Sequence, residues 1–257
     1  MIDIHTHILH GVDDGSPDIK ISIEHLKLMQ EAGITDVFLT SHFLRPAFQN
    51  PVELITERIA ELRDAAKKEN INIKLHRGAE IYLDDGIHNI IESEQLSLAD
   101  TKYLLVETNM TEFPADLYHI LYELVRSGYK PILAHPERYM NVMMKPSIVE
   151  DIIHKNVYMQ INSSSLLGHY GNSIQKTAWR LLEQGHAHFL ASDNHCRVPI
   201  YDHNLAVNLI RKNIDDFTAD LLTKTNPVKI LTGEKIEYFY VKSIQQEKKG
   251  FFSRFFK

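Results

Sequence analysis

Imidazole and carboxylate side chains recur along this sequence in groups that suit the binding of divalent metal ions. The chain has 15 His among its 257 residues. Near the N-terminus His5 and His7 are two residues apart, and Asp193 and His195 repeat that spacing far along the chain. Alternate residues of a strand point to the same side, so both members of each pair can reach one ion. Mixed nitrogen and oxygen donors favour Mn, Fe or Zn over Ca, which prefers oxygen.

Further groups of the same kind follow other short apolar stretches. A His-x-His pair alone is a weak signal, because such pairs also form ordinary hydrogen bonds. Recurrence after successive stretches is what favours a metal centre. The whole set exceeds the four positions of one tetrahedral ion, so it predicts two or three ions, with Glu80 as the bridging carboxylate. The predicted ligands are His5, His7, Asp14, His42, Glu80, Glu107, His135, Asp193 and His195.

The elements that must position these ligands alternate between short β-branched stretches and amphipathic helical stretches. Ser16-Pro17 has the pattern of a helix N-cap followed by proline, and Gly33 that of a helix end. Further helices are expected at about 51–68, 116–127, 173–184 and 202–212. The predicted strands are Ile2–His5, Asp36–Thr40, Ile71–Leu75, Tyr103–Val106, Pro131–Ala134, Val157–Ile161 and His188–Ala191.

This alternation predicts an α/β fold, either a parallel barrel or a doubly wound sheet. We favour a TIM-like (β/α)7 barrel, because a candidate ligand follows almost every strand, as a ring would require. Active sites of such barrels lie at the carboxyl ends of the strands.

The composition narrows the function further. The formal net charge of −6 offers no basic face for nucleic acid. No apolar run or leader suits a membrane span or export, and the lone Cys196 excludes an internal disulfide, so we expect a cytoplasmic protein.

We expect one domain over 1–242 and a basic aromatic tail over 243–257. That tail suits peripheral contact with an anionic membrane or a partner, and also a disordered or packed terminus.

Several phosphatase chemistries are absent from the sequence. A cysteine phosphatase needs Arg six residues after the nucleophile, where Cys196 is followed by Asp202. An aspartyl-phosphate enzyme would place Asp-x-Asp after a strand, and the first strand carries Asp3-Ile4-His5 instead. No glycine-rich Walker loop is present.

The stretches that carry these ligands resemble the PHP (polymerase and histidinol phosphatase) superfamily. Within it, the chain is most similar to bacterial CpsB/CapC-type protein tyrosine phosphatases, through MIDIHTHILHGVDDGS, TSHF, GAEIY, LLVET, PILAHPERY, QINSSSL and HFLASDNH. The resemblance implies a distorted seven-stranded barrel with a trinuclear cluster, often containing manganese. The implied ligand sets are His5, His7, Glu80 and Asp193; Glu80, Glu107 and His135; and Asp14, His42 and His195.

The resemblance also implies the reaction and its partners. Arg138 resembles the arginine that binds phosphate, and coordination lowers the pKa of water to about 7, which would supply an attacking hydroxide. A phenolate leaving group needs little proton assistance, and the candidate acids are His42, Asp14 and a metal-bound water. The implied substrate is a protein that carries phosphotyrosine. The implied protein is a bacterial tyrosine kinase that controls capsular or exopolysaccharide synthesis.

Two other functions stay open at this point. One is a phosphatase or phosphodiesterase acting on a small metabolite such as histidinol phosphate, or on a nucleic-acid end. Another is a binding module without activity, which the full ligand set disfavours. An amidohydrolase also begins with His-x-His, but it would place a bridging Lys where this chain has Glu107.

Overall fold

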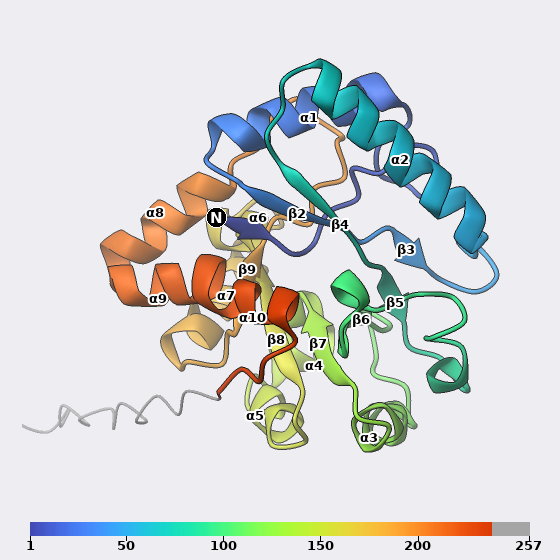
Figure 1. The fold of residues 1–257 in the computed structure, drawn as a ribbon. Coiled ribbons are helices and arrows are strands. Elements are labelled where there is room, and N and C mark those ends of the chain that lie inside the picture. The colour runs from blue at the N-terminus through green and yellow to red at the C-terminus, as the bar shows by residue number, and fades with distance from the viewer. Residues whose placement is uncertain (238–257) are drawn as a thin grey trace, which may run out of the picture.

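The strands are short, parallel and almost wholly buried in this computed structural model, which describes residues 1–237 (Figure 1). The predicted tail over 243–257 and the last residues of the predicted domain lie outside this range. Every pairing between the named strands is parallel. The strands are β1 (Ile2–Asp3), β2 (Asp36–Leu39), β3 (His42–Phe43), β4 (Lys74–Arg77), β5 (Glu80–Tyr82), β6 (Tyr103–Glu107), β7 (Lys130–Ala134), β8 (Tyr158–Asn162) and β9 (Phe189–Ala191).

These strands form two sheets, in the orders β1-β2-β4 and β3-β5-β6-β7-β8-β9. The chain passes from β2 to β3 and from β4 to β5 after short breaks. β3 and β5 lie beyond the predicted ranges of the second and third strands. Across the breaks the Glu80 N–H donates to the Thr40 carbonyl oxygen at 3.2 Å. A parallel bridge between Thr6 and Asn194 joins the first strand to the last. The predicted α/β fold with parallel strands is therefore present, and these contacts connect its two sheets in the order that a distorted barrel requires.

Alternating side chains of the strands separate an inner from an outer core. Tyr103 and Leu105 of β6 pack inside with Phe38 and Phe189, whereas Leu104 belongs to the cluster under the outer helices. This is the period of two that a strand imposes on its side chains.

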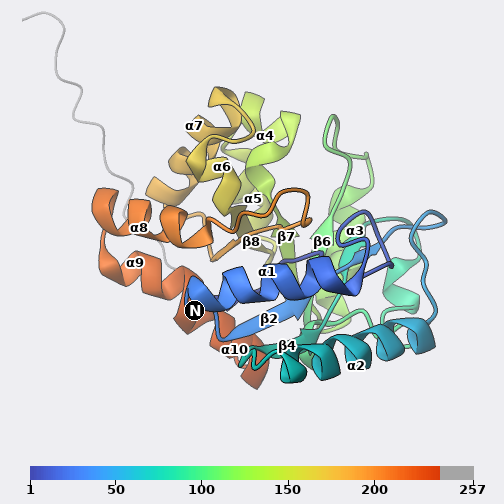
Figure 2. The ribbon, with the colours of Figure 1, turned by 90° about the horizontal axis from the view of Figure 1, so that it is seen from above.

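The helices cover the outside of the strands, with α1 and α2 over the three-stranded sheet (Figure 2). The longer helices are α1 (Ile19–Glu31), α2 (Val52–Lys68), α3 (Leu117–Arg126), α7 (Asn172–Glu183) and α8 (His203–Asn213). The shorter elements are η1 (Ile87–Asn89), η2 (Leu98–Asp100), η3 (Pro136–Arg138), α4 (Met140–Met144), α5 (Ile148–Ile153), α6 (Ser163–Leu167), α9 (Asp216–Asp220), η4 (Leu221–Thr225) and α10 (Asn226–Thr232).

Two predicted boundaries were wrong. The N-cap of α1 is Asp18 rather than Ser16, because the Asp18 carboxylate accepts the N–H groups of Lys20 and Ile21. The hydroxyl of Ser16 instead donates to the Asp18 carbonyl oxygen at 2.9 Å. Gly33 does end the helix, with φ +82°.

The third strand begins later than predicted. Ile71 N–H donates to the Ala66 carbonyl oxygen at 2.9 Å, after Asn70 adopts a left-handed φ of 56°. Ile71 and Ile73 are buried with Leu62 of α2. Their apolar character reflects packing at the helix end, and pairing with β2 starts only at Lys74.

The elements after α8 were not predicted, and they close the amino-terminal end of the barrel. Ile230 of α10 and Ile236 are fully buried with the inner side chains of the strands. Tyr103 and Tyr158 donate their hydroxyls to the carbonyl oxygens of Glu234 and Ile236, at 2.6 and 3.0 Å. Within residues 1–237 no helix has both the length and the apolar character that crossing a membrane requires.

Asp3 connects the first strand to the last through buried hydrogen bonds. Its Oδ1 accepts the Ser192 N–H at 3.0 Å, and its Oδ2 accepts the hydroxyls of Ser192 and Tyr201 at 2.5 and 2.8 Å. We expect Asp3→Ala to lower the free energy of unfolding by about 3 kcal/mol or more, since several buried donors lose their acceptor. Tyr201→Phe removes one hydroxyl and should cost about 1 kcal/mol. Urea unfolding measures both, and equal losses would contradict this role for Asp3.

Candidate metal centre

The predicted ligands converge at the carboxyl ends of the strands. Although they come from seven separate stretches of sequence, their donor atoms fall into four groups, each within 4.8 Å. The groups are His7, Asp14, His42 and His195; His5, His7 and Asp193; His5, Glu80 and His135; and His42, Glu80 and Glu107.

Glu80 lies at the centre of this arrangement. Its Oε2 is 3.2 Å from His5 Nε2, 3.3 Å from His7 Nε2 and 3.1 Å from His42 Nδ1. Its Oε1 is 2.9 Å from His135 Nε2. A carboxylate placed between four imidazoles has the geometry expected of a bridge between ions.

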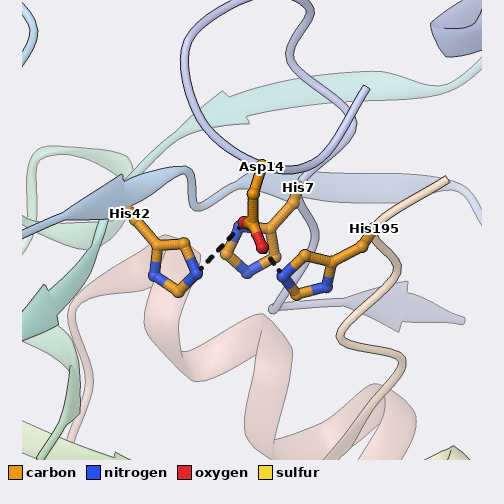
Figure 3. Close-up of side chains that lie close together, drawn as sticks. All are labelled: His7, Asp14, His42 and His195. Atoms are coloured by element: carbon orange, nitrogen blue, oxygen red, sulfur yellow. Dashed lines mark ion pairs between the residues drawn. The ribbon is translucent and has the colours of Figure 1, made fainter. Parts of the chain in front are cut away.

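Asp14 joins His42 and His195 on the outer side of this arrangement, with His7 beside them (Figure 3). Asp14 Oδ1 is 3.5 Å from His42 Nε2 and 3.4 Å from His195 Nε2. The rings of His7 and His195 stack with their centroids 3.9 Å apart. Asp14 is partly exposed, so this side of the centre faces the mouth of the barrel.

One implied ligand set differs from the observed grouping. Glu107 was expected beside His135, but its Oε2 is 4.0 Å from His135 Nε2. Its Oε1 lies closer to His42 Nδ1, at 3.2 Å. Glu107 therefore groups with His42 and Glu80, and His5 takes its place beside His135.

Buried hydrogen bonds behind the rings fix which nitrogen faces the centre. His5 Nδ1 lies 2.8 Å from Gln160 Oε1, and His7 Nδ1 lies 2.7 Å from Asp13 Oδ2. Both Nε2 atoms then point inward, 3.1 Å apart. Oriented imidazoles of this kind are typical of metal ligands, whose other nitrogen is held by a carboxylate or amide.

Asp13 contacts the predicted ligand His7, although its sequence pattern did not make it a candidate. Besides orienting His7, it accepts the N–H groups of His42 and Gly15, each at 3.0 Å. The sequence showed two adjacent acids, Asp13 and Asp14, and could not show that they face opposite ways. Gly15 is required here, because a Cβ at that position would lie 2.0 Å from the His7 carbonyl oxygen.

Strained backbone turns direct two of the ligands inward. His135 follows β7 with φ 37°, and Asp193 follows β9 with φ 55°. Non-glycine residues rarely adopt this left-handed conformation, which costs about 1–3 kcal/mol and concentrates at functional sites. Both turns direct a ligand toward Glu80 or His5.

The donor set fits divalent cations. Within residues 1–237, Glu80 Oε2 and Asp193 Oδ1 are buried without a hydrogen-bond donor, although imidazole nitrogens surround them. Buried acceptors without donors are costly, and a shared cation would satisfy both. Nitrogen and oxygen donors together match Mn, Fe or Zn.

Protons balance the charge of this cluster when no cation does so. Burial opposes the charged form of His42, but hydrogen bonds to Glu107 and Glu80 outweigh burial and raise its pKa to about 10. Burial likewise opposes charge on Glu80, while His5, His135 and His42 bring its pKa well below the ordinary value. A ligating imidazole must be neutral, so cations have to displace these protons, and their apparent affinity falls as the pH is lowered.

Arg138 lies beside the cluster in η3. Its Nη1 donates to Asp193 Oδ2 at 2.9 Å, and its guanidinium carbon lies 4.6 Å from the centre of the Tyr170 ring. Arg138 thus pairs with Asp193 rather than with the adjacent acid Glu137. Glu137 is fully buried and accepts the Asn162 N–H at 2.9 Å.

Two neighbouring residues do not belong to the centre. His10 lies close in sequence to the predicted ligands His5 and His7, but its Nε2 lies 3.0 Å from Glu61 Oε2 on α2. Cys196 is buried in the core under α1, and burial raises the pKa of its thiol to about 12. A thiol of this kind is a poor nucleophile.

Residues 1–232 match the family model described as "Capsular polysaccharide synthesis, CpsB/CapC". The chain is 36% identical over 196 residues to a putative tyrosine-protein phosphatase CapC of Staphylococcus aureus, covering 76% of this chain and 77% of that protein. It is 31% identical over 245 residues to the tyrosine-protein phosphatase CpsB of Streptococcus pneumoniae, covering 92% and 100%.

Solved structures agree with this similarity. One comes from work on YwqE of Bacillus subtilis and CpsB of Streptococcus pneumoniae, described as unique metal-dependent tyrosine phosphatases. It matches with a TM-score of 0.87 at 31% identity over 94% of this chain and 100% of that chain. A histidinol phosphate phosphatase from Lactococcus lactis shares the fold, with a TM-score of 0.53 at 14% identity over 82% and 92%.

The position of Asp13 behind His7 generates a prediction. We expect Asp13→Asn to weaken divalent-metal binding by about 10-fold to 100-fold, because an amide can no longer fix the His7 tautomer and charge. Titration of the apoprotein with Mn²⁺ measures this loss. Asp64→Asn, an exposed change on α2, is the control. Equal affinities of the Asp13 and Asp64 variants would contradict an orienting role.

Proposed function

Because the chain belongs to the CpsB/CapC family of capsular polysaccharide synthesis proteins, we propose that it is a metal-dependent tyrosine-protein phosphatase. The observation that carries the proposal is the placement of Arg138 on Asp193, a carboxylate that also faces the imidazoles of the cluster. One carboxylate thereby contacts both the proposed phosphate-binding side chain and the proposed metal ligands.

The grouped side chains would hold two or three divalent ions. His5, His7 and Asp193 form one set, and His7, Asp14, His42 and His195 form another. Glu80 belongs to two further sets, one with His5 and His135 and one with His42 and Glu107. When bound, such ions screen the phosphate charge and lower the pKa of water so that it can attack phosphorus. Manganese stays the predicted metal, and the donor types also accept Fe or Zn.

Arg138 would hold the phosphoryl group against this centre. A guanidinium offers several N–H groups in one plane, which suits two phosphate oxygens at once. Asp193 takes one of these N–H groups and sets the orientation of the plane, and the Tyr170 ring covers it from one side. The side chain is 27% exposed, so a ligand can reach it.

The departing phenolate needs little proton assistance, because the pKa of tyrosine is about 10. His42 and Asp14 stay the predicted acids. Both nitrogens of the His42 ring lie close to carboxylates of the cluster. This position suits His42 as a ligand more than as an acid. Asp14 Oδ2 instead pairs with the exposed Arg197 at 2.8 Å, so Asp14 has access to solvent.

The proposed substrate protein and cellular process rest on the similarity to the family. The proposed protein substrate is a phosphotyrosine protein, specifically a bacterial tyrosine kinase, and the proposed process is capsular or exopolysaccharide synthesis. A cytoplasmic location and contact of the 243–257 tail with the inner membrane surface stay predictions of the sequence. That segment lies outside the described residues.

A substrate panel tests the proposed activity. Apoprotein prepared with a chelator should be inactive, and added Mn²⁺ should restore hydrolysis of phosphotyrosine peptides in preference to phosphoserine peptides, histidinol phosphate and oligonucleotides. Bound metal would be counted by elemental analysis of the same samples. Preference for histidinol phosphate or oligonucleotides would replace the proposed substrate, and full activity in metal-free protein would refute the metal requirement.

Arg138 provides the matched test of phosphate binding. We expect Arg138→Ala to keep its bound metal but to lose at least about 100-fold in kcat/KM, since removing one charged group from the transition state costs about 2.7–4 kcal/mol. Arg138→Lys should recover only part of this loss, because an ammonium lacks the planar fork. Arg126→Ala, an exposed arginine of α3, is the control. Unchanged kinetics for Arg138→Ala would remove it from the reaction.

A further inference from the structure

An aromatic ring stands at the mouth of the metal centre, on the side of Arg138. Tyr170 lies in the turn between α6 and α7, and 40% of its surface is exposed. The centre of its ring is 4.6 Å from the Arg138 guanidinium carbon. Burial, followed by the nearby charge of Asp193, raises the pKa of its phenol. Tyr170 is therefore next to Arg138, the side chain that is proposed to hold the phosphate.

The turn that carries Tyr170 is tightly fixed. Gly168 and Gly171 flank it with φ +86° and +93°, which side chains rarely adopt. The Gly171 N–H donates to the Gly168 carbonyl oxygen at 3.0 Å. The Leu166 carbonyl oxygen accepts from Gln175 and Trp179 of α7, at 2.9 and 3.2 Å. The ring is thus presented from a backbone that is held at both ends.

We propose that the Tyr170 ring is the surface against which the aryl group of the substrate packs, and that it selects phosphotyrosine over phosphoserine and phosphothreonine. The inference rests on the proposed phosphatase function. A phosphate held by Arg138 places its ester oxygen close to the guanidinium, and the Tyr170 ring already contacts that guanidinium. An aryl group on that oxygen then comes within the 4.5–7 Å at which aromatic rings associate.

Size explains why an alkyl phosphate gains less from this ring. Phosphoserine has a single methylene between its ester oxygen and the peptide backbone, so it offers almost no apolar surface to Tyr170. Phosphotyrosine offers a whole ring, and it also keeps the peptide backbone farther from the barrel. The partial exposure of Tyr170 is consistent with this role, because the ring retains surface that Arg138 does not cover.

The test separates binding of the aryl group from support of Arg138. Competitive inhibition by phenylphosphonate and methylphosphonate would be measured on the Mn-loaded enzyme, since neither compound has a leaving group. For Tyr170→Leu we expect the preference for phenylphosphonate to fall about 3-fold to 10-fold, the worth of an aromatic pair. Tyr170→Phe should keep the preference. Tyr118→Leu, which replaces a partly exposed tyrosine of α3, should keep it as well.

Loss of Arg138 support alone would weaken both phosphonates equally and leave their ratio unchanged. An unchanged ratio in Tyr170→Leu therefore overturns the inference, and so does an equal fall in Tyr170→Phe, which would assign the effect to the hydroxyl. Thermal unfolding of each variant confirms that it is folded. A wild-type enzyme that binds phenylphosphonate but hydrolyses no phosphotyrosine peptide would refute the proposed function, whereas normal hydrolysis with an unchanged ratio refutes only the role of Tyr170.

Discussion

The buried carboxylate of Glu80 sets the strongest constraint on this molecule. It is 1% exposed, and a buried charge of that kind is tolerated only when opposite charges surround it. Four imidazoles from three separate parts of the sequence lie within 3.3 Å of its two oxygens. The strands that carry them must therefore end at the same level and the same side, which a parallel barrel achieves. Protons on the imidazoles or cations between them can supply the balancing charge.

The polar side chains around this carboxylate orient the predicted ligands and are not ligands themselves. Gln160 and Asp13 fix the rings of His5 and His7 from behind. Asn162 donates to Asp193 Oδ2 at 2.7 Å, on the oxygen that also accepts from Arg138. The other oxygen of Asp193 is thereby left facing the imidazoles. Left-handed backbone at Asp193 is stable only because such contacts determine its position.

The sequence predicted the parts of this design that depend on local pattern. Strands such as β6 and β7 were visible as short apolar stretches. The predicted ligands lie in or near the carboxyl ends of the stretches predicted as strands. The prediction failed where a long-range partner decides the outcome. Asp13 and Asp14 are adjacent residues of the same type. Only the position of His7 in the fold shows that Asp13 is the one that orients its ring. Glu107 likewise groups with His42 because the ends of β3 and β6 lie close together, and the spacing of residues along the sequence does not reveal this.

Apolar character was the other source of error. Ile71 and Ile73 have strand-like residue types, yet they pack under α2 and lie ahead of the pairing with β2. Ile230 and Ile236 lie beyond the last predicted helix and fill the inner core at the opposite end from the metal centre. In both cases the residues are buried, as their chemistry requires. What the sequence could not provide is the surface against which they are buried.

The two ends of the ligand set meet only when the barrel closes. His5 and His7 come from the first strand, and Asp193 and His195 from the last, so their contact depends on the bond between the His5 carbonyl oxygen and the Asp193 N–H at 2.9 Å. Asp3 and Ser192 complete the same seam across 189 positions of sequence. Bringing such distant segments together costs chain entropy, which the packed core must offset. A cation bound by both segments adds its binding free energy to the closed state, because the open chain does not form the site. Closure of the fold and binding of a cation would therefore depend on the same few residues.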